Sequence, residues 1–235
     1  NTSFVSAPEG TSFAKLRKFA MGTTPLNTGR LEKIPLLDAK GTLKGLYLLP
    51  GSLREQGRTI LVTGGAGYVG SHVCSKLLQK GYKVVVLDTL LFGDDGIRDL
   101  RANKNFSLIE GDISNIGTLI HAVQQADAVI HLAGIVGDPA AALNPVHTME
   151  QNHFATKALI DVCKHYQIAR FVFASSCSVY GASPGILDEG SELFPVSLYA
   201  QSKRYSEYAL LTEADEDFHP VILRFGTLYG LSPRM

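Results

Sequence analysis

The chain has few of the features that mark a membrane, secreted or nucleic-acid-binding protein. Its 235 residues include three cysteines and no tryptophan, and 22 basic residues are balanced by 22 acidic ones. The cysteines are too few and too widely spaced for a disulfide framework or a zinc knuckle, and the charge balance favours no nucleic-acid partner. No apolar run approaches the ~20 residues of a membrane helix, and residues 1–10 lack the layout of a secretory signal. We therefore expect a cytoplasmic protein with no membrane partner and no metal site.

From residue 58 onward, apolar strand segments alternate with amphipathic helical segments. The predicted strands are 59–62, 83–87, 106–109, 128–132, 171–174 and 221–225, and the predicted helices are 68–80, 116–125, 149–167 and 198–214. This alternation predicts right-handed crossovers and an α/β fold with a doubly wound parallel sheet, a Rossmann fold. In such a sheet, ligands bind beyond the carboxyl ends of the strands.

Residues 1–57 differ from the rest, and we predict that they form an N-terminal extension to a Rossmann domain of residues 58–235. Residues 11–21 predict a short basic helix. Residues 33–49 predict a hairpin of two strands around an Asp-Ala-Lys-Gly turn. We assign this extension no chemistry.

A glycine turn follows the first predicted strand of the Rossmann domain. It reads Thr-Gly-Gly-Ala-Gly-Tyr-Val-Gly from Thr63 and satisfies the G-x-G-x-x-G pattern. Glycines let the backbone turn tightly and approach a pyrophosphate at the N-terminus of the next helix. The turn follows a strand and opens a helix, which is the context that makes this short motif informative. The residues predicted to bind a dinucleotide here are Gly64, Gly67, Tyr68, Val69 and Gly70.

Acidic residues follow the next two predicted strands. Asp88 ends the second strand, where a carboxylate accepts hydrogen bonds from a ribose 2′-hydroxyl and repels a 2′-phosphate. No arginine follows it directly, so the sequence favours NAD over NADP. Asp112 and Ile113 follow the third strand and either contact the adenine or form a simple turn.

Tyr199 and Lys203 are spaced four residues apart on a predicted helix, so their side chains share a face. A free phenol has a pKa near ~10 and is a poor base at neutral pH. An adjacent ammonium group favours the phenolate and lowers that pKa. With the glycine turn, the pair indicates a nicotinamide enzyme that acts on an alcohol or ketone.

These motifs, with four others, resemble the extended short-chain dehydrogenase/reductases, and among them the nucleotide-sugar epimerases. The other four are His131-Leu132-Ala133-Gly134, Asn152, Ser175-Ser176-Cys177-Ser178-Val179-Tyr180-Gly181 and Leu223-Arg224-Phe225-Gly226-Thr227-Leu228-Tyr229-Gly230. The resemblance runs from residue 58 to residue 235, and the order and spacing of the motifs make it specific.

The resemblance implies a role for each matching position. Tyr199 would be the base that takes the sugar hydroxyl proton, and Lys203 would bind the nicotinamide ribose and lower the pKa of Tyr199. Ser176 would hydrogen-bond the same sugar oxygen. Leu132, Ala133 and Gly134 would line the cofactor.

Two polar residues of these motifs, Asn152 and Arg224, have expected roles that are wholly or partly structural. Asn152 would support the active-site helix, as its counterparts in the family do. Arg224 would either face the substrate or be a buried structural arginine.

The residues after Ser176 discriminate among activities of the family. Relatives that dehydrate or decarboxylate nucleotide sugars carry carboxylates where this chain has Cys177 and Ser178. Without a second proton-transfer group, dehydration is disfavoured, and 4-epimerisation or simple oxidoreduction is left. Cys177 would be either an acid/base group or a small packing residue, and we favour packing.

We therefore expect an NAD-dependent nucleotide-sugar epimerase that acts by transient oxidation at C4. The alternatives are a net sugar or hydroxysteroid-type oxidoreductase and a non-catalytic NAD-binding protein. Family members continue past the position of Met235 into a smaller substrate domain, so the resemblance implies that this chain lacks that domain. The resemblance also implies a homodimer.

Overall fold

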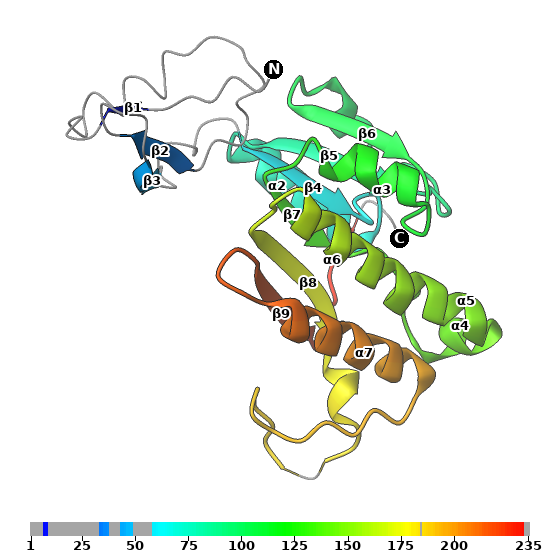
Figure 1. Cartoon of the computed structure of the whole chain (residues 1–235). Coiled ribbons are helices and arrows are strands. Elements are labelled where there is room, and N and C mark those ends of the chain that lie inside the picture. Colours follow the sequence, from blue (N-terminus) through cyan, green and yellow to red (C-terminus); the bar gives the residue numbers. More distant parts are fainter. Residues whose placement is uncertain (1–6, 9–32, 38–42, 49–57, 184, 233–235) are drawn as a thin grey trace. The chain divides into compact units, whose positions relative to one another are not determined.

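The computed structural model describes residues 7–8, 33–37, 43–48, 58–183 and 185–232 (Figure 1). The chain divides into two compact units, Asn1–Gln56 and Gly57–Met235. In the first unit, β1 (Ala7–Pro8) pairs in parallel with β2 (Lys33–Leu37), which pairs antiparallel with β3 (Leu43–Leu48). Both strands of the predicted hairpin are therefore present. The predicted turn between them and the predicted helix over residues 11–21 lie outside the described residues.

The second unit is built on a six-stranded sheet in which every neighbouring pair is parallel. The strands are β4 (Thr59–Thr63), β5 (Lys83–Asp88), β6 (Phe106–Glu110), β7 (Ala128–His131), β8 (Arg170–Ser176) and β9 (His219–Phe225). Their spatial order is β6-β5-β4-β7-β8-β9, so the chain reverses direction across the sheet between β4 and β7. This order confirms the predicted doubly wound Rossmann fold and places a ligand crevice at that reversal.

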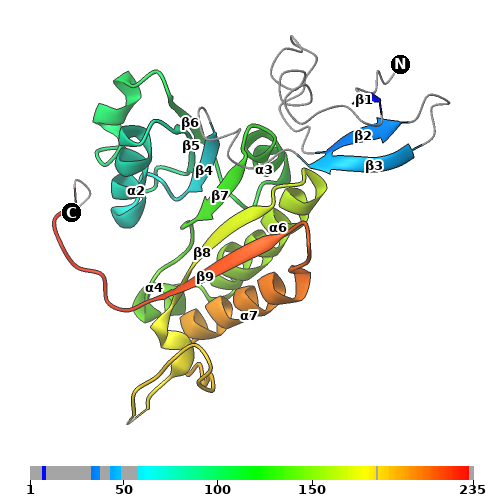
Figure 2. The same cartoon turned by 90° about the vertical axis from the view of Figure 1, so that its left-hand side faces the viewer.

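Helices cover both faces of this sheet, with α2 on one side and α3, α6 and α7 on the other (Figure 2). The α-helices are α2 (Tyr68–Gln79), α3 (Ile116–Val123), α4 (Asp138–Leu143), α5 (Pro145–Met149), α6 (Ala155–His165) and α7 (Leu198–Glu213). The shorter helical turns are η2 (Arg98–Ala102), the π-helical η3 (Glu150–Phe154) and η4 (Cys177–Tyr180).

The core has two parts because strand side chains alternate between the faces of the sheet. On β4, Ile60 and Val62 pack with Cys74 of α2, whereas Leu61 packs with Leu119 of α3 and with other apolar residues of the α3, α6 and α7 layer. Parallel strands covered on both faces are expected to be apolar throughout. Cys74 of α2 is buried in the part of the core that contains Ile60 and Val62.

Two helical segments differ from the prediction. The long helix expected over 149–167 instead begins at Pro145 and contains the π-helical turn η3 before α6. The prediction also missed α4, a six-residue helix that begins with Asp138 and Pro139. Pro139 fixes its own φ and suits the first turn of a helix, but the segment carries too few residues for a periodic signal.

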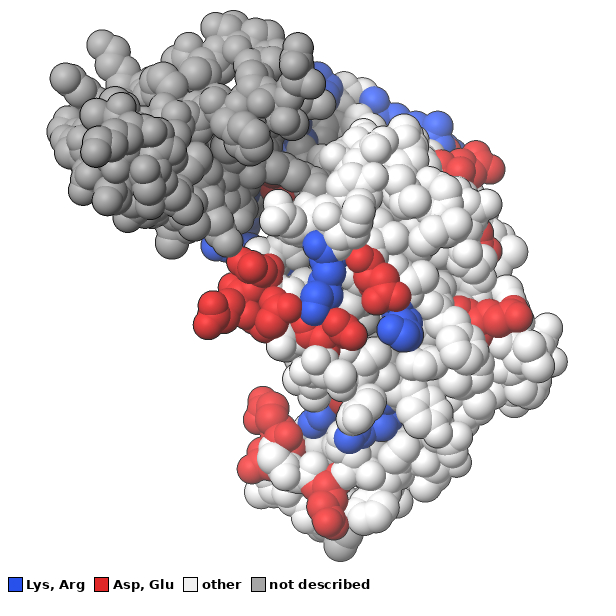
Figure 3. Space-filling model, viewed as in Figure 1, with Lys and Arg blue, Asp and Glu red and all other residues white. Residues whose placement is uncertain are grey.

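Charged side chains of both signs are interspersed over the described part of the face in Figure 3, with uncharged surface between them. Within the described residues, no helix is both long and apolar enough to cross a bilayer.

Candidate active site

The carboxyl ends of the strands enclose a cavity of about 770 Å³. It extends from the glycine turn after β4 to the start of α7. Every residue predicted from the sequence to bind the cofactor or take part in catalysis lines it. These residues are Gly64, Gly67, Tyr68, Val69, Gly70, Asp88, Asp112, Ile113, Leu132, Ala133, Gly134, Ser176, Tyr199 and Lys203. The fold thus brings together positions at the ends of five strands, β4 to β8, and on helix α7.

The glycine turn is shaped by close backbone packing. Gly64 has φ +70°, and a Cβ there would lie 2.7 Å from the backbone nitrogen of Ala133. A Cβ on Gly70 would collide with the carbonyl oxygen of Gly64. Gly67 occupies the N-cap position of α2 but has no side chain to bond the free N–H groups of the first turn. That turn also holds no acidic residue. The turn therefore presents an uncapped helix N-terminus to the cavity, and this arrangement fits a pyrophosphate.

Asp88, at the end of β5, stabilises the glycine turn by hydrogen bonding. Its Oδ2 accepts a hydrogen bond from the backbone N–H of Ala66 at 2.9 Å, and its Oδ1 accepts one from Leu90 at 2.9 Å. Each carboxylate oxygen has a second lone pair for a ribose hydroxyl. The residue thus orders the turn and also faces the cavity.

Asp112 is also held by neighbouring groups. Both of its carboxylate oxygens accept from Gln151 Nε2, at 3.0 and 3.2 Å, and Oδ1 accepts from the backbone N–H of Ser114. Hydrogen bonds from Ser114 and Gln151 outweigh partial burial and lower the pKa of Asp112. Gln151 itself lines the cavity. Because it belongs to the unexpected π-helical turn, spacing alone could not have singled it out.

The three predicted catalytic side chains come from two elements. Tyr199 and Lys203 lie on α7, whose first turn is capped by Ser197, and Ser176 ends β8. All three are buried or nearly so. The ammonium of Lys203 donates to the carbonyl oxygen of Ala174 at 2.9 Å and lies 4.9 Å from the centre of the Phe173 ring.

Burial changes the expected electrostatics of Tyr199. Desolvation is the largest effect and raises the pKa of Tyr199; hydrogen bonding from Ser176 lowers it, and Asp138 raises it further. The net direction is thus opposite to a lowered pKa, and the expectation that the ammonium of Lys203 offsets part of this rise stays a prediction. Lys203 is itself affected by burial, which lowers its pKa to about 8, although Glu207 acts in the opposite direction.

The prediction for Cys177 is also wrong. Its side chain is exposed and lines the cavity, so it is not a small packing residue. It follows directly after Ser176, whose Oγ accepts from the backbone N–H of Ser178 and caps η4. This tight turn directs Cys177 out of the core.

The structure decides the alternatives for Arg224 and places Asn152. Arg224 is absent from the cavity lining and binds Glu207 through two nitrogens, at 2.8 and 3.0 Å, so it is a structural arginine. Asn152 is buried and donates to Ser202 Oγ at 3.1 Å. Its side-chain amide also accepts from the backbone N–H of Ile135 and donates to the carbonyl oxygen of Ile135. It thereby connects the loop after β7 to α7.

Several cavity-lining residues carry no sequence signal. Phe92 and Leu228 are large exposed apolar residues that line the cavity. The segment that includes Leu228 follows β9 and crosses to α2, where Tyr68 Oη donates to the carbonyl of Gly230 at 2.5 Å and His72 bonds Leu231. These contacts join residues about 160 positions apart in the chain, so they depend on the tertiary fold.

The strand order, the glycine turn and the cavity at the reversal of the sheet define a Rossmann-type protein. The sequence model of the NAD-dependent epimerase/dehydratase family matches residues 60–235. The chain therefore belongs to this family.

Characterised relatives give the comparison more detail. A UDP-glucose 4-epimerase of Cyamopsis tetragonoloba is 33% identical over 74% of this chain and 52% of its own length. The UDP-Glc/GlcNAc 4-epimerase of Campylobacter jejuni superimposes with a TM-score of 0.68 at 32% identity, covering 72% of this chain and 53% of that one. A UDP-glucuronic acid 4-epimerase of Bacillus cereus, in complex with NAD, gives 0.68 at 33% identity, covering 75% and 59%. The chain spans about half the length of these relatives.

Proposed function

We propose that the chain carries the NAD site and catalytic residues of a UDP-sugar 4-epimerase. The observation that supports this most strongly is that one cavity is lined by the glycine turn, Asp88, and the set of Ser176, Tyr199 and Lys203. The curated relatives named above are 4-epimerases of UDP-linked sugars. No carboxylate for a second proton transfer stands at positions 177 and 178, which hold Cys177 and Ser178.

In this proposal, NAD is held by the glycine turn, by Asp88 at a ribose and by Lys203 at the nicotinamide end. The turn fits because Cβ atoms on Gly64 or Gly70 would fill the space that its backbone uses. Bound NAD would supply the hydride acceptor and donor for the sugar C4.

The protein residues handle the proton and the oxygen. Tyr199 takes the proton of the C4 hydroxyl as the hydride leaves and returns it after the sugar presents its other face. Ser176 donates a hydrogen bond to the same oxygen and so stabilises charge that develops there. Because burial raises the pKa of Tyr199, the phenolate needs a positive neighbour, and the ammonium of Lys203 one helical turn away supplies it.

The cofactor proposal is tested by thermal unfolding with NAD, with NADP and with neither. A ligand that binds only the folded chain adds about 2.7 kcal/mol at 100 times its dissociation constant. We expect a shift with NAD and none with NADP. Absence of a shift in a chain that retains no NAD would contradict the proposal.

The catalytic proposal is tested by Tyr199→Phe. Removing the proton-transfer group should lower kcat for UDP-glucose epimerisation by about 10²–10⁴-fold. The NAD-dependent thermal shift should remain because the phenol hydroxyl is a small part of the cofactor site. Undiminished turnover in this variant would overturn the mechanism. A stoichiometric change in nicotinamide absorbance in the unmodified chain would favour the net oxidoreductase instead.

A homodimer also remains a prediction. Large apolar side chains are exposed on η3 and α7, among them Phe154, Tyr205, Tyr208 and Leu211. Two copies could bury these side chains against each other, and a measurement of molar mass in solution would test this.

A further inference from the structure

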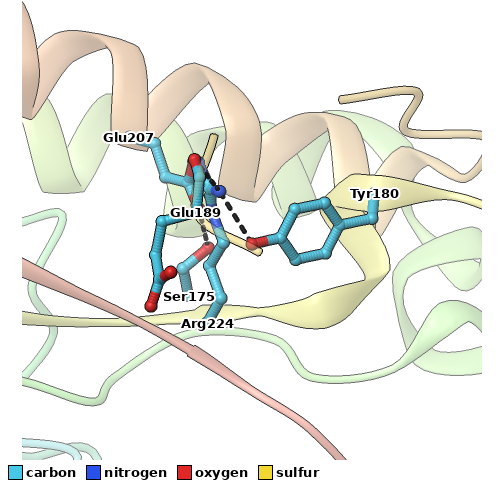
Figure 4. A network of polar contacts seen from close by, with 5 residues as sticks. All are labelled: Ser175, Tyr180, Glu189, Glu207 and Arg224. Atoms are coloured by element: carbon cyan, nitrogen blue, oxygen red, sulfur yellow. Dashed lines mark hydrogen bonds and ion pairs between the residues drawn. The ribbon is translucent and has the colours of Figure 1, made fainter. Parts of the chain in front are cut away.

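A buried ion pair lies outside the cavity lining and next to the segments that carry the predicted catalytic residues. Glu207 of α7 is fully buried, and the side chain of Arg224 from β9 is only 16% exposed. Arg224 Nη2 donates to Glu207 Oε2 at 2.8 Å, and Arg224 Nε donates to Oε1 at 3.0 Å. Figure 4 shows the guanidinium of Arg224 between Glu207 and Tyr180, and the side chain of Ser175, which bonds the same carboxylate.

The ion pair holds both ends of the segment that carries Ser176. Before it, Ser175 Oγ donates to Glu207 Oε1 at 2.5 Å. After it, Arg224 Nη1 donates to Tyr180 Oη at 2.9 Å, at the last residue of η4. The register of the sheet agrees with this arrangement because Ser175 pairs with Arg224 across β8 and β9. Ser176 is thus fixed on either side by one charged cluster.

The same cluster is joined to the catalytic helix. Glu207 follows Lys203 by four residues and Tyr199 by eight, so the three side chains share one face of α7. A buried ion pair gives little net stability compared with apolar residues of the same volume. Stability alone therefore does not account for a charged pair at this place, whereas a fixed geometry between β8 and α7 does.

We propose that Glu207 is a positioning residue: its carboxylate, held by Arg224 and Ser175, fixes Ser176 against the helix face of Tyr199 and Lys203 and faces Lys203 with a compensating charge. This inference rests on the proposed function, to which it adds a residue outside the cavity lining. Glu207 acts through Ser176 and Lys203 and does not touch the substrate.

The surroundings of Lys203 make its charge sensitive to Glu207. Burial lowers the pKa of Lys203 to about 8, and Glu207 is the charge that raises it. The other titratable groups near Lys203 are Tyr199 on the same helix and His131 of β7, and Arg224 lies beyond Glu207. Burial lowers the pKa of His131 to about 3, so His131 is neutral near pH 7 and adds no charge beside Lys203.

The first test titrates Lys203 by carbon NMR of labelled lysine methylenes, with the signal assigned by Lys203→Arg. In Glu207→Gln, the side chain keeps its size but loses its charge, so the Lys203 titration should move to lower pH by at least about half a unit. The matched control is Glu213→Gln on the same helix, which breaks a half-buried ion pair with Lys164. That variant should leave the Lys203 titration unchanged.

The second test measures kcat and KM for UDP-glucose epimerisation. In Glu207→Gln, kcat should fall about tenfold with KM nearly constant, since the lost contact acts on the transition state. The alkaline limb of the pH profile should move to lower pH, because Lys203 loses its proton earlier. Glu213→Gln should match the unmodified chain in all three quantities.

A double variant covers the case in which Glu207→Gln folds poorly. Glu207→Met with Arg224→Met replaces the pair by apolar side chains of similar length, which a core often tolerates. We expect a folded chain with the lowered Lys203 titration and the reduced kcat. A double variant with full kcat and an unshifted Lys203 would overturn the proposal, as would a Glu207→Gln variant identical to Glu213→Gln. If the unmodified chain does not turn over UDP-glucose, the proposed function fails, and the NMR titration alone decides the role of Glu207.

Discussion

The two halves of the cavity are built in different ways. The cofactor half consists of β4, β5, β6 and the start of α2, and it is shaped by backbone: Gly64 and Gly70 pack without side chains, and Asp88 binds backbone N–H groups. The catalytic half consists of β7, β8, β9 and α7, and it depends on bonds between side chains, such as that of Glu207 with Arg224. The cofactor half should therefore be destabilised by substitutions that add side-chain atoms at its glycines. The catalytic half should be destabilised by substitutions that remove one partner of a side-chain bond.

The largest expected effect comes from removing a partner in the catalytic half. Arg224→Met leaves the buried carboxylate of Glu207 without its counter-ion and should lower the free energy of unfolding by about 3–5 kcal/mol. Urea denaturation measures this loss. The double variant with Glu207→Met should recover most of it, because no charge is then left alone. A single variant as stable as the unmodified chain would show that the halves do not differ in this respect.

A smaller loss of stability is expected from adding one methyl group in the cofactor half. The Cβ of Gly70→Ala would collide with the carbonyl oxygen of Gly64, so the turn must shift. We expect a cost of about 1–3 kcal/mol and loss of the NAD-dependent thermal shift. Gly185→Ala is the control, because no neighbouring heavy atom lies within 4 Å of a Cβ there. Retained NAD binding in Gly70→Ala would contradict the backbone-shaped site.

The last expected effect is a pH dependence at the junction of the halves. His131 of β7 bonds Thr63 Oγ1 of β4 at 2.6 Å and Thr156 Oγ1 of α6 at 2.8 Å. Burial lowers the pKa of His131 from 6.5 to about 3, so between these values the unfolded chain binds a proton that the folded chain does not. Stability contributed by this group is therefore lost as pH falls below 6.5, by up to about 1.4 kcal/mol per unit.

His131→Gln tests this dependence because an amide does not titrate. The difference in unfolding free energy between the two chains should shrink as pH is lowered from 7 to 5, values that bracket the ordinary pKa of histidine at about 6.5. A constant difference over that range would show that His131 titrates normally in the folded chain.

The comparison of the halves also explains which predictions succeeded. The glycine turn and the acid that ends β5 were predicted because their requirements lie within a few neighbouring residues. The alternation of strands and helices likewise predicted a doubly wound parallel sheet, which the strand order confirms. The spacing of Tyr199 and Lys203 placed them on one helical face for the same local reason.

The remaining features depend on residues that are distant in the sequence. The sequence by itself determined the Rossmann fold, the turn after β4 and those cavity-lining positions that belong to its motifs. Only the tertiary structure decided that Arg224 binds Glu207, that Cys177 is exposed, and that burial raises the pKa of Tyr199. Turn sterics and helical periodicity act between near neighbours, whereas burial and ion pairing depend on which elements the folded chain packs against each other.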